Sequence, residues 1–386
     1  MTSAEPMRVL VAGAGVAGLE TVLALQALAG DRTAIELLAP DRHFTYRPLA
    51  VAEPFAPGSV QRFPIAAIAA DRAVPLVRDA VAQVHADDRV VETQDGSRLE
   101  YDALVLALGS RPTEAVPGAL TFRGPQDVGR VGDVVAALRA GTIRRVAFVV
   151  PGGTTWALPL YELALQAATA VRGAGAAAEL SLVTPEPTPL AAFGEEAGAA
   201  VTTLLEERGI TLRTGAIADD FDEGRLWMGL EGSFAVDRVI ALARLVGPRP
   251  RGVPCDPLGY IPVDEFTRVL GLDAVHAVGD AAAHGVKQGG LAAQQADVAA
   301  SVLAAAAGAP VTPKPYDPVL RGLLLTGGEN HYLRRERGGP TEVSNEILWW
   351  PPGKIVGRHL APYLAAHLEL GRPAAPASAI PVQAKA

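Results

Sequence analysis

The chain has 386 residues, of which 49% are hydrophobic and 20% are charged, and its formal net charge is −8 at pH 7. A chain of this length is expected to form two or three domains, because single domains typically contain ~100–200 residues. The acidic balance excludes the basic surface that attracts nucleic acid, and the single cysteine, Cys255, excludes a disulfide framework within the chain. No HExxH-type spacing is present, so we predict no metal site.

The first predicted unit is a strand, a glycine-rich turn and a helix, in MRVLVAGAGVAGLETVLALQAL at 7–28. In such a turn the first glycine reverses the chain, the second lets N–H groups approach a pyrophosphate, and the third lets the helix pack on the strand. The apolar stretch 9–30 contains Glu20 and three glycines, so we interpret it as neither a membrane span nor a signal peptide and expect a cytoplasmic protein. The residues predicted here to bind a dinucleotide are Gly13, Gly15, Val16, Ala17 and Gly18.

The next strand, AIELLAP at 34–40, ends at Ala39 where an acidic residue usually binds the adenosine ribose. Glu36 lies earlier and Asp41 directly after the strand. Asp41 is the favoured ribose ligand because it lies in the loop, although both residues are also compatible with ordinary surface carboxylates. The following loop brings aromatic and basic groups beside the nucleotide. Packing is the favoured role for these residues, and Arg47 is kept as a cofactor-binding candidate. They are His43, Phe44, Tyr46 and Arg47.

The middle of the chain predicts a second strand–turn–helix unit at 144–168, strands at 179–184, 210–215 and 237–243, and a helix at 195–209. The proline-rich stretch 247–254 leads back toward the first unit. Cys255 follows it, and we expect a small buried apolar residue there, with a catalytic role as the alternative.

The stretch 266–300 predicts a short strand that ends at Gly279-Asp280, and a helix that begins at Gly289-Gly290. A carboxylate at a strand tip can accept a hydrogen bond from a ribityl hydroxyl. A Gly-Gly helix start presents N–H groups that stabilise negative charge on a reduced flavin. Lys287 is the catalytic candidate, because a cation here would stabilise the same charge, although a surface lysine fits equally well.

The C-terminal part predicts a small antiparallel sheet in 316–350 and a helix at 355–370. Trp349 and Trp350 suit either the wall of an apolar acceptor channel or, preferably, burial in an interface. The tail at 371–386 is predicted to be disordered.

Three motifs in this order resemble the pyridine nucleotide–disulfide oxidoreductase superfamily: the 13–18 turn, YDALVLALGSRP at 101–112, which contains Gly109, and HAVGDAA at 276–282. The loop at 40–55 is similar to that of type II NADH dehydrogenases and sulfide:quinone oxidoreductases. The resemblance implies an α/β protein with two Rossmann-like three-layer domains, FAD as cofactor, the 13–18 glycines on its pyrophosphate and Asp280 on its ribityl chain. The implied domains are FAD-binding, 1–115 and 252–310; NAD(P)-binding-like and inserted in the first, 116–251; and a capping or interface segment, 311–370.

The second turn, VVPGGTTWALPLYE at 149–162, departs from the glycine fingerprint of NAD(P)H-binding members. Prolines 151 and 159 bracket the turn, and Trp156 adds bulk where a pyrophosphate needs open backbone. We therefore predict that the NAD(P)H site has degenerated, as in the sulfide:quinone oxidoreductase branch, with an anion nest at 152–155 as the alternative. That branch uses a pair of cysteines, which a chain with one cysteine does not supply.

The sequence therefore predicts an FAD-dependent oxidoreductase that passes electrons from an unidentified donor to a small acceptor, a quinone by resemblance. One alternative is an NAD(P)H-dependent reductase that uses the altered turn. The other is a flavoprotein subunit that needs a redox partner such as a cytochrome or ferredoxin. A homodimer and peripheral membrane contact are further possibilities.

Overall fold

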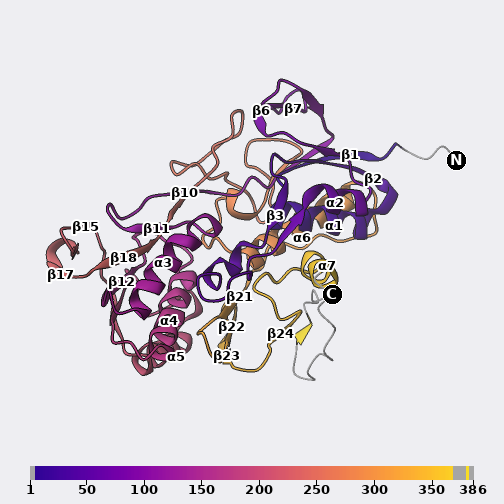
Figure 1. Ribbon diagram of the computed structural model, residues 1–386. Helices are drawn as coiled ribbons and strands as arrows, with labels where there is room; N and C mark the ends of the chain where they lie inside the picture. The colour runs from indigo at the N-terminus through magenta and orange to yellow at the C-terminus, as the bar shows by residue number, and fades with distance from the viewer. Residues whose placement is uncertain (1–4, 368–379, 382–386) are drawn as a thin grey trace.

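The computed structural model describes residues 5–367 and 380–381, and two five-stranded parallel sheets organise them (Figure 1). The first sheet has the strand order β20-β9-β1-β2-β5, and the second has the order β11-β18-β12-β13-β14. The first contains β1 (Met7–Ala12), β2 (Thr33–Leu38), β5 (Leu76–Val77), β9 (Ala103–Leu106) and β20 (Val275–Ala277). The second contains β11 (Leu120–Phe122), β12 (Arg145–Val149), β13 (Glu179–Val183), β14 (Ile210–Arg213) and β18 (Arg238–Leu242).

Each sheet is the middle of three layers, because alternate residues of its strands enter different cores. In the first unit, Val9 and Val11 face α1 (Val16–Ala29) and α6 (Gly289–Ala306), whereas Leu10 packs toward the antiparallel strands β6 (Val81–His85), β7 (Val90–Thr93) and β8 (Arg98–Glu100). In the second, helices again cover one face and an antiparallel sheet covers the other. The helices are α3 (Val128–Arg139), α4 (Leu158–Gly173) and α5 (Glu195–Glu207), and the strands are β15 (Asp220–Asp222), β16 (Arg225–Trp227) and β17 (Ser233–Ala235). The predicted α/β class with two Rossmann-like units is confirmed.

The second unit is inserted in the first. The chain leaves the first unit through β10 (Arg111–Thr113) and returns through β19 (Arg244–Val246), and the two strands pair antiparallel. The returning chain then adds β20 to the edge of the first sheet, beside β9. The loop after β2 contains β3 (His43–Thr45), which pairs with β4 (Arg62–Pro64), and α2 (Ile65–Asp71) follows.

The C-terminal segment, defined here as residues 311–367, lies against both units (Figure 1). Its antiparallel sheet of β21 (Val319–Leu324), β22 (His331–Glu336) and β23 (Thr341–Ser344) contacts α4 and α6, and it confirms the sheet predicted for this region. The predicted helix at 355–370 is wrong at its start, because α7 (Leu360–His367) begins five residues later, and its predicted end lies outside the described residues. The backbone N–H groups of Ile355 and His359 instead donate to the side chains of Tyr46 and Glu20, which holds this stretch outside a helix.

The predicted disordered tail lies outside the described residues, except for β25 (Ile380–Pro381), which pairs with β24 (Trp349–Trp350). Trp349 is buried against Tyr332 and Val356 rather than in a channel wall. Within the described ranges, no helix is long and apolar enough to cross a membrane.

Candidate functional site

A cavity of about 300 Å³ lies where the first unit, the second unit and the C-terminal segment meet. The first unit contributes Val16, Arg47, Pro48, Val51, Ser110, Pro112, Tyr260, Asp280, Lys287, Gln288 and Gly289. The second contributes Phe122, Arg123, Gly124, Gly153, Thr154, Thr155, Trp156, Leu158, Pro159, Glu162, Leu242, Ala243 and Leu245. Arg321, Gly322, Leu323 and Lys354 come from the C-terminal segment. The structure thus brings Val16, Arg47, Asp280, Lys287 and Gly289 of the predicted set together.

The turn between β1 and α1 has two glycines that the fold itself requires. A Cβ on Gly13 would lie 2.2 Å from the carbonyl oxygen of Ala107, and one on Gly18 would lie 1.8 Å from that of Gly13. A Cβ on Gly15, in contrast, would meet nothing within 4 Å. No contact within the protein requires glycine at position 15. The backbone at the start of α1 is therefore open there. The first N–H groups of a helix lack intrahelical acceptors, so this turn offers the donors and the room that a pyrophosphate needs.

Asp280 follows β20 at the edge of the cavity. Burial raises the pKa of its carboxyl, while the charges of Lys287 and Arg47 and a hydrogen bond with Ser110 oppose that shift. Gly279, with φ +70°, lets this turn approach α1, because a Cβ on it would lie 2.9 Å from the Cβ of Ala17. A partly buried carboxylate of this kind is suited to accept hydrogen bonds from the hydroxyl groups of a ligand.

Lys287 is a buried lysine, which answers the question that the sequence left open. Its side chain is 6% exposed, and its Nζ donates to the carbonyl of Ala282 at 2.5 Å and lies 3.9 Å from the ring centre of Tyr260. Burial lowers the pKa of Lys287 to about 8, while the carboxylate of Asp280 opposes the shift. The ammonium therefore keeps a proton at neutral pH and releases it within a mildly alkaline range.

The second turn can be aligned with the first through strand register. The N–H of Gly13 donates to Leu38 at the end of β2, and the N–H of Val150 donates in the same way to Val183 at the end of β13. Counting from these two residues, Gly152 corresponds to Gly15 and Thr155 to Gly18.

The helices that follow the two turns start at different points. Helix α1 begins at Val16, three residues after Gly13, whereas α4 begins at Leu158, eight residues after Val150. The intervening residues form a turn in which Trp156 packs on Phe193 and the hydroxyl of Thr155 accepts a hydrogen bond from the N–H of Lys287 at 3.3 Å. Relative to the end of its strand, the positive N-terminal end of α4 therefore lies farther along the chain than that of α1.

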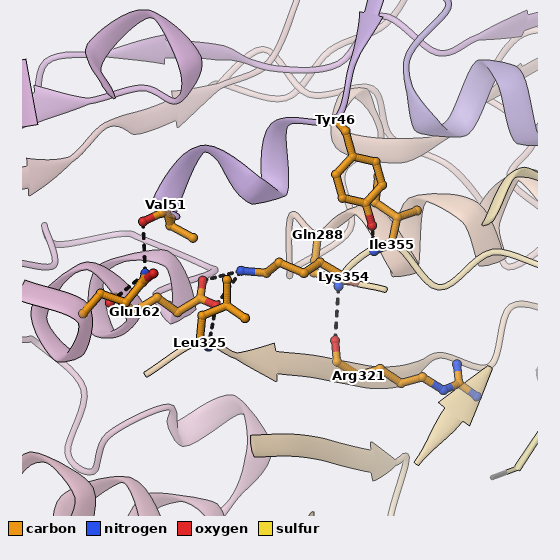
Figure 2. A network of polar contacts seen from close by, with 9 residues as sticks. Tyr46, Val51, Glu162, Gln288, Arg321, Leu325, Lys354 and Ile355 are labelled. Carbon is orange, nitrogen blue, oxygen red and sulfur yellow. Dashed lines mark hydrogen bonds and ion pairs between the residues drawn. The ribbon is translucent and has the colours of Figure 1, made fainter. Parts of the chain in front are cut away.

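A network of buried polar contacts fixes the C-terminal segment to the cavity wall (Figure 2). Lys354 Nζ lies 2.5 Å from both carboxylate oxygens of Glu162, and the N–H of Leu325 donates to the same carboxylate at 3.0 Å. Burial raises the pKa of Glu162 and lowers that of Lys354, and the opposite charge of each partner counteracts both shifts. The Tyr46 hydroxyl accepts from Ile355 at 2.9 Å, so Tyr46 is a packing residue as predicted.

Several predicted residues lie elsewhere. Cys255 is outside the cavity lining and packs against the core on the antiparallel side of the first sheet, where burial raises the pKa of its thiol. The structure therefore does not place this thiol at the site. Asp41 is exposed, and its backbone carbonyl accepts from Arg78. Gly109, with φ +69°, precedes the lining residue Ser110, and Gly290 lies one residue beyond the lining in the first turn of α6.

The family model for pyridine nucleotide-disulphide oxidoreductases matches residues 7–299. The chain belongs to this family. Members of this family are FAD-dependent oxidoreductases, so the chain is an oxidoreductase with FAD as its cofactor. The chain is 29% identical to an NADH dehydrogenase-like protein of Mycobacterium tuberculosis over 294 residues, which covers 72% of this chain and 73% of the relative.

Two further similarities agree with this family. The ferredoxin reductase component of the chlorobenzene dioxygenase of a Cupriavidus strain is 29% identical over 346 residues, covering 83% of this chain and 80% of the relative. The solved sulfide:quinone oxidoreductase of Aquifex aeolicus superposes with a TM-score of 0.79 at 18% identity, covering 88% of this chain and 87% of that one. At this identity the structural similarity establishes the fold.

Sequence reasoning missed Gln288, Tyr260 and the Glu162–Lys354 pair as parts of the site. One signal was available for Glu162, because a carboxylate inside the apolar helix 158–173 needs a buried partner. Glu20 in α1 carries the same signal. Their partners lie 192 and 340 residues away in sequence, at Lys354 and Leu360, where no local pattern indicates them.

Proposed function

We propose that the chain is an FAD-dependent oxidoreductase whose flavin exchanges electrons with a small organic molecule of quinone type in the cavity, and that NAD(P)H is not its electron donor. The observation that carries this proposal is the late start of α4 at Leu158 and the hydrogen bond from Lys287 to Thr155 across the same turn. A pyrophosphate needs exposed N–H groups at a helix start, and this turn offers Trp156 and Pro159 in their place.

The residues suited to hold FAD are the 13–18 turn for the pyrophosphate and Asp280 for the ribityl hydroxyls. When bound, FAD supplies the two-electron chemistry. Lys287 holds a proton at Nζ, and Asp280 and Tyr260 orient it at the cavity. Reduction of a quinone to a quinol consumes two electrons and two protons. A bound reduced flavin would supply both electrons and one of these protons. We assign Lys287 the delivery of the other proton, with replacement from solvent.

The walls of the cavity support an apolar ring as the ligand. Phe122, Trp156 and Leu158 face it from the second unit, and Leu242 and Leu245 continue the same wall. Small-molecule sites are typically lined by apolar side chains with a few polar groups that fix orientation. Here the polar groups of the lining include Lys287 and the Glu162–Lys354 pair.

A second candidate function is electron transfer to a small redox protein. One relative favours it, because it is named the ferredoxin reductase component of a dioxygenase. In this candidate function, the flavin would pass its electrons to a redox protein bound at the protein surface. The cavity would then either bind a nicotinamide as electron donor or bind no substrate.

The two candidates differ in how the reduced protein is reoxidised. Protein reduced with dithionite without oxygen is mixed with a soluble quinone such as menadione or with a ferredoxin, and the oxidised flavin band is followed. We expect fast reoxidation by the quinone. A Leu245→Trp variant, which fills the cavity, should slow it about 10-fold or more, because even a small misplacement of reacting groups is costly. The control is Leu258→Trp, at a residue that is 60% exposed and outside the lining. Reoxidation by ferredoxin alone would refute the quinone proposal.

A further inference from the structure

Gln288 holds the start of α6 in an unusual way. It is the N-cap of the helix, and its Oε1 accepts a hydrogen bond from the N–H of Leu291 at 2.8 Å. Its Nε2 donates to the backbone carbonyl of Arg321 in β21 at 3.2 Å (Figure 2). The side chain is 8% exposed and lines the cavity. One neutral amide therefore caps the helix and fixes it to the C-terminal segment.

The identity of this cap has an electrostatic consequence. Asp, Asn, Ser and Thr are the preferred N-caps, because their short side chains reach the first-turn N–H groups. A carboxylate at 288 would also accept from Leu291, but it has no proton to donate to Arg321. It would also place a negative charge against the positive end of the helix and cancel much of its field. The amide satisfies both partners and leaves that field intact.

The two glycines after Gln288 make room for this arrangement. A Cβ on Gly290 would lie 3.0 Å from Gln288 Oε1, and one on Gly289 would lie 3.3 Å from Ile355 of the C-terminal segment. The Gly-Gly pair that the sequence suggested as an open surface for a flavin thus also accommodates the folded-back cap. The cap, the buried Lys287 and the carboxylate of Asp280 all line the cavity.

We infer that Gln288 is a positioning residue whose neutral amide holds α6 in place while leaving the positive end of the helix free to stabilise negative charge in the cavity. This rests on the proposed placement of FAD beside Asp280 and Lys287. Uptake of two electrons and one proton leaves a reduced flavin with one negative charge, so the cap acts on the equilibrium between the oxidised and reduced cofactor. Nothing in this role requires Gln288 to exchange protons or electrons.

The experiment compares flavin midpoint potentials of the full-length protein and two isosteric variants, with dithionite as reductant. Gln288→Glu adds a charge at the cap. Gln294→Glu is the matched control, because Gln294 lies farther along the same helix, bonds the backbone of Val319 in the same strand and of Gly290, and does not line the cavity. We expect Gln288→Glu to make the potential more negative, by about a 2- to 5-fold change in the ratio of reduced to oxidised flavin. Gln294→Glu should leave the potential unchanged while losing similar thermal stability.

An unchanged potential in Gln288→Glu, or an equal shift in both variants, would overturn the inference. If Gln288→Glu does not fold, Gln288→Lys decides, because it adds a positive charge at the same position. A more positive potential supports the electrostatic role of this position, and an unchanged or more negative potential contradicts it. Wild-type protein that binds no FAD would refute the cofactor placement instead. The measurement uses no quinone, so its result is independent of the proposed acceptor.

Discussion

The two strand–turn–helix units of the chain begin alike and then diverge. Both strands end in the same hydrogen-bond register, at Gly13 and Val150. After Gly13 the helix starts within three residues and leaves open space above Gly15. After Val150 the chain forms a turn of seven residues, 151–157, which contacts Lys287 of the other unit before α4 starts. A Rossmann-like sheet can therefore keep its topology while the phosphate-binding geometry of its turn is lost.

The two helices still share one feature. Glu20 and Glu162 are each the fifth residue of their helix, and both are fully buried. Glu20 accepts from the N–H groups of His359 and Leu360, and Glu162 accepts from the N–H of Leu325 and pairs with Lys354. The C-terminal segment is therefore held by carboxylates at the same helix position in both units, and each carboxylate satisfies groups that would otherwise be buried without partners.

Alanine substitutions at the aligned turn positions, Gly18 and Thr155, should show the largest difference in stability between the two units. Gly18→Ala places a Cβ 1.8 Å from a backbone oxygen, so we expect a loss of more than ~3 kcal/mol of stability and little soluble flavoprotein. Thr155→Ala removes one hydrogen bond, which should cost about 1 kcal/mol. Soluble yield and thermal melting measure both. Equal tolerance at the two sites would contradict the divergence of the two turns.

Breaking the buried pair on α4 should have the next largest effect. Glu162→Gln leaves Lys354 buried without a counter-charge, and such a change typically costs about 3–5 kcal/mol. Urea unfolding measures the loss. The double variant Glu162→Leu with Lys354→Met should recover much of the stability, because both charges are then absent. A double variant as unstable as the single one would show that the loss arises from packing.

Gly15→Ala probes the open space of the first turn. The added methyl group meets no protein atom within 4 Å, so the melting temperature without FAD should remain within a few degrees of wild type. The FAD dissociation constant should rise about 10-fold or more, because the methyl group occupies the approach to the pyrophosphate. Gly152→Ala, at the equivalent position of the second turn, is the control and should not change FAD affinity. Unchanged affinity in both variants would place the pyrophosphate elsewhere.

A smaller effect, of pH on stability, is expected from the carboxyl groups of Glu20 and Asp297, which interact near the start of α7. Burial, followed by the charge of Glu20, raises the pKa of Asp297 to about 8, while Arg358 opposes the shift. The folded state therefore binds more protons than the unfolded state between the ordinary carboxyl pKa of ~4 and pH 8, so stability should fall as pH rises through this range. Asp297→Asn should flatten this slope in melting curves recorded from pH 5 to 9. An identical slope in the variant would assign the pH dependence to other groups.

The parts of the fold that the sequence predicted are those with local signals. Local sequence patterns located most strands of both sheets but not the short β5 and β11. The glycine spacing at 13–18 and the strand-end Asp280 located part of the cavity lining. The anchors of the C-terminal segment have no such signal, because Tyr46 meets Ile355 across 309 residues and Glu20 meets Leu360 across 340. The stretch 355–359 has a helical pattern but a backbone that is bonded to distant side chains. Tertiary contacts decide the backbone conformation of this stretch, and the local sequence pattern does not reveal those contacts.

The most direct test of the account is an anaerobic titration of the purified flavoprotein with NADH and then NADPH, followed at the oxidised flavin band. We predict that neither nucleotide bleaches the flavin within minutes at equimolar concentration, whereas dithionite reduces it fully. Fast stoichiometric bleaching by either nucleotide would contradict the account, because the turn between β12 and α4 would then still bind a nicotinamide nucleotide.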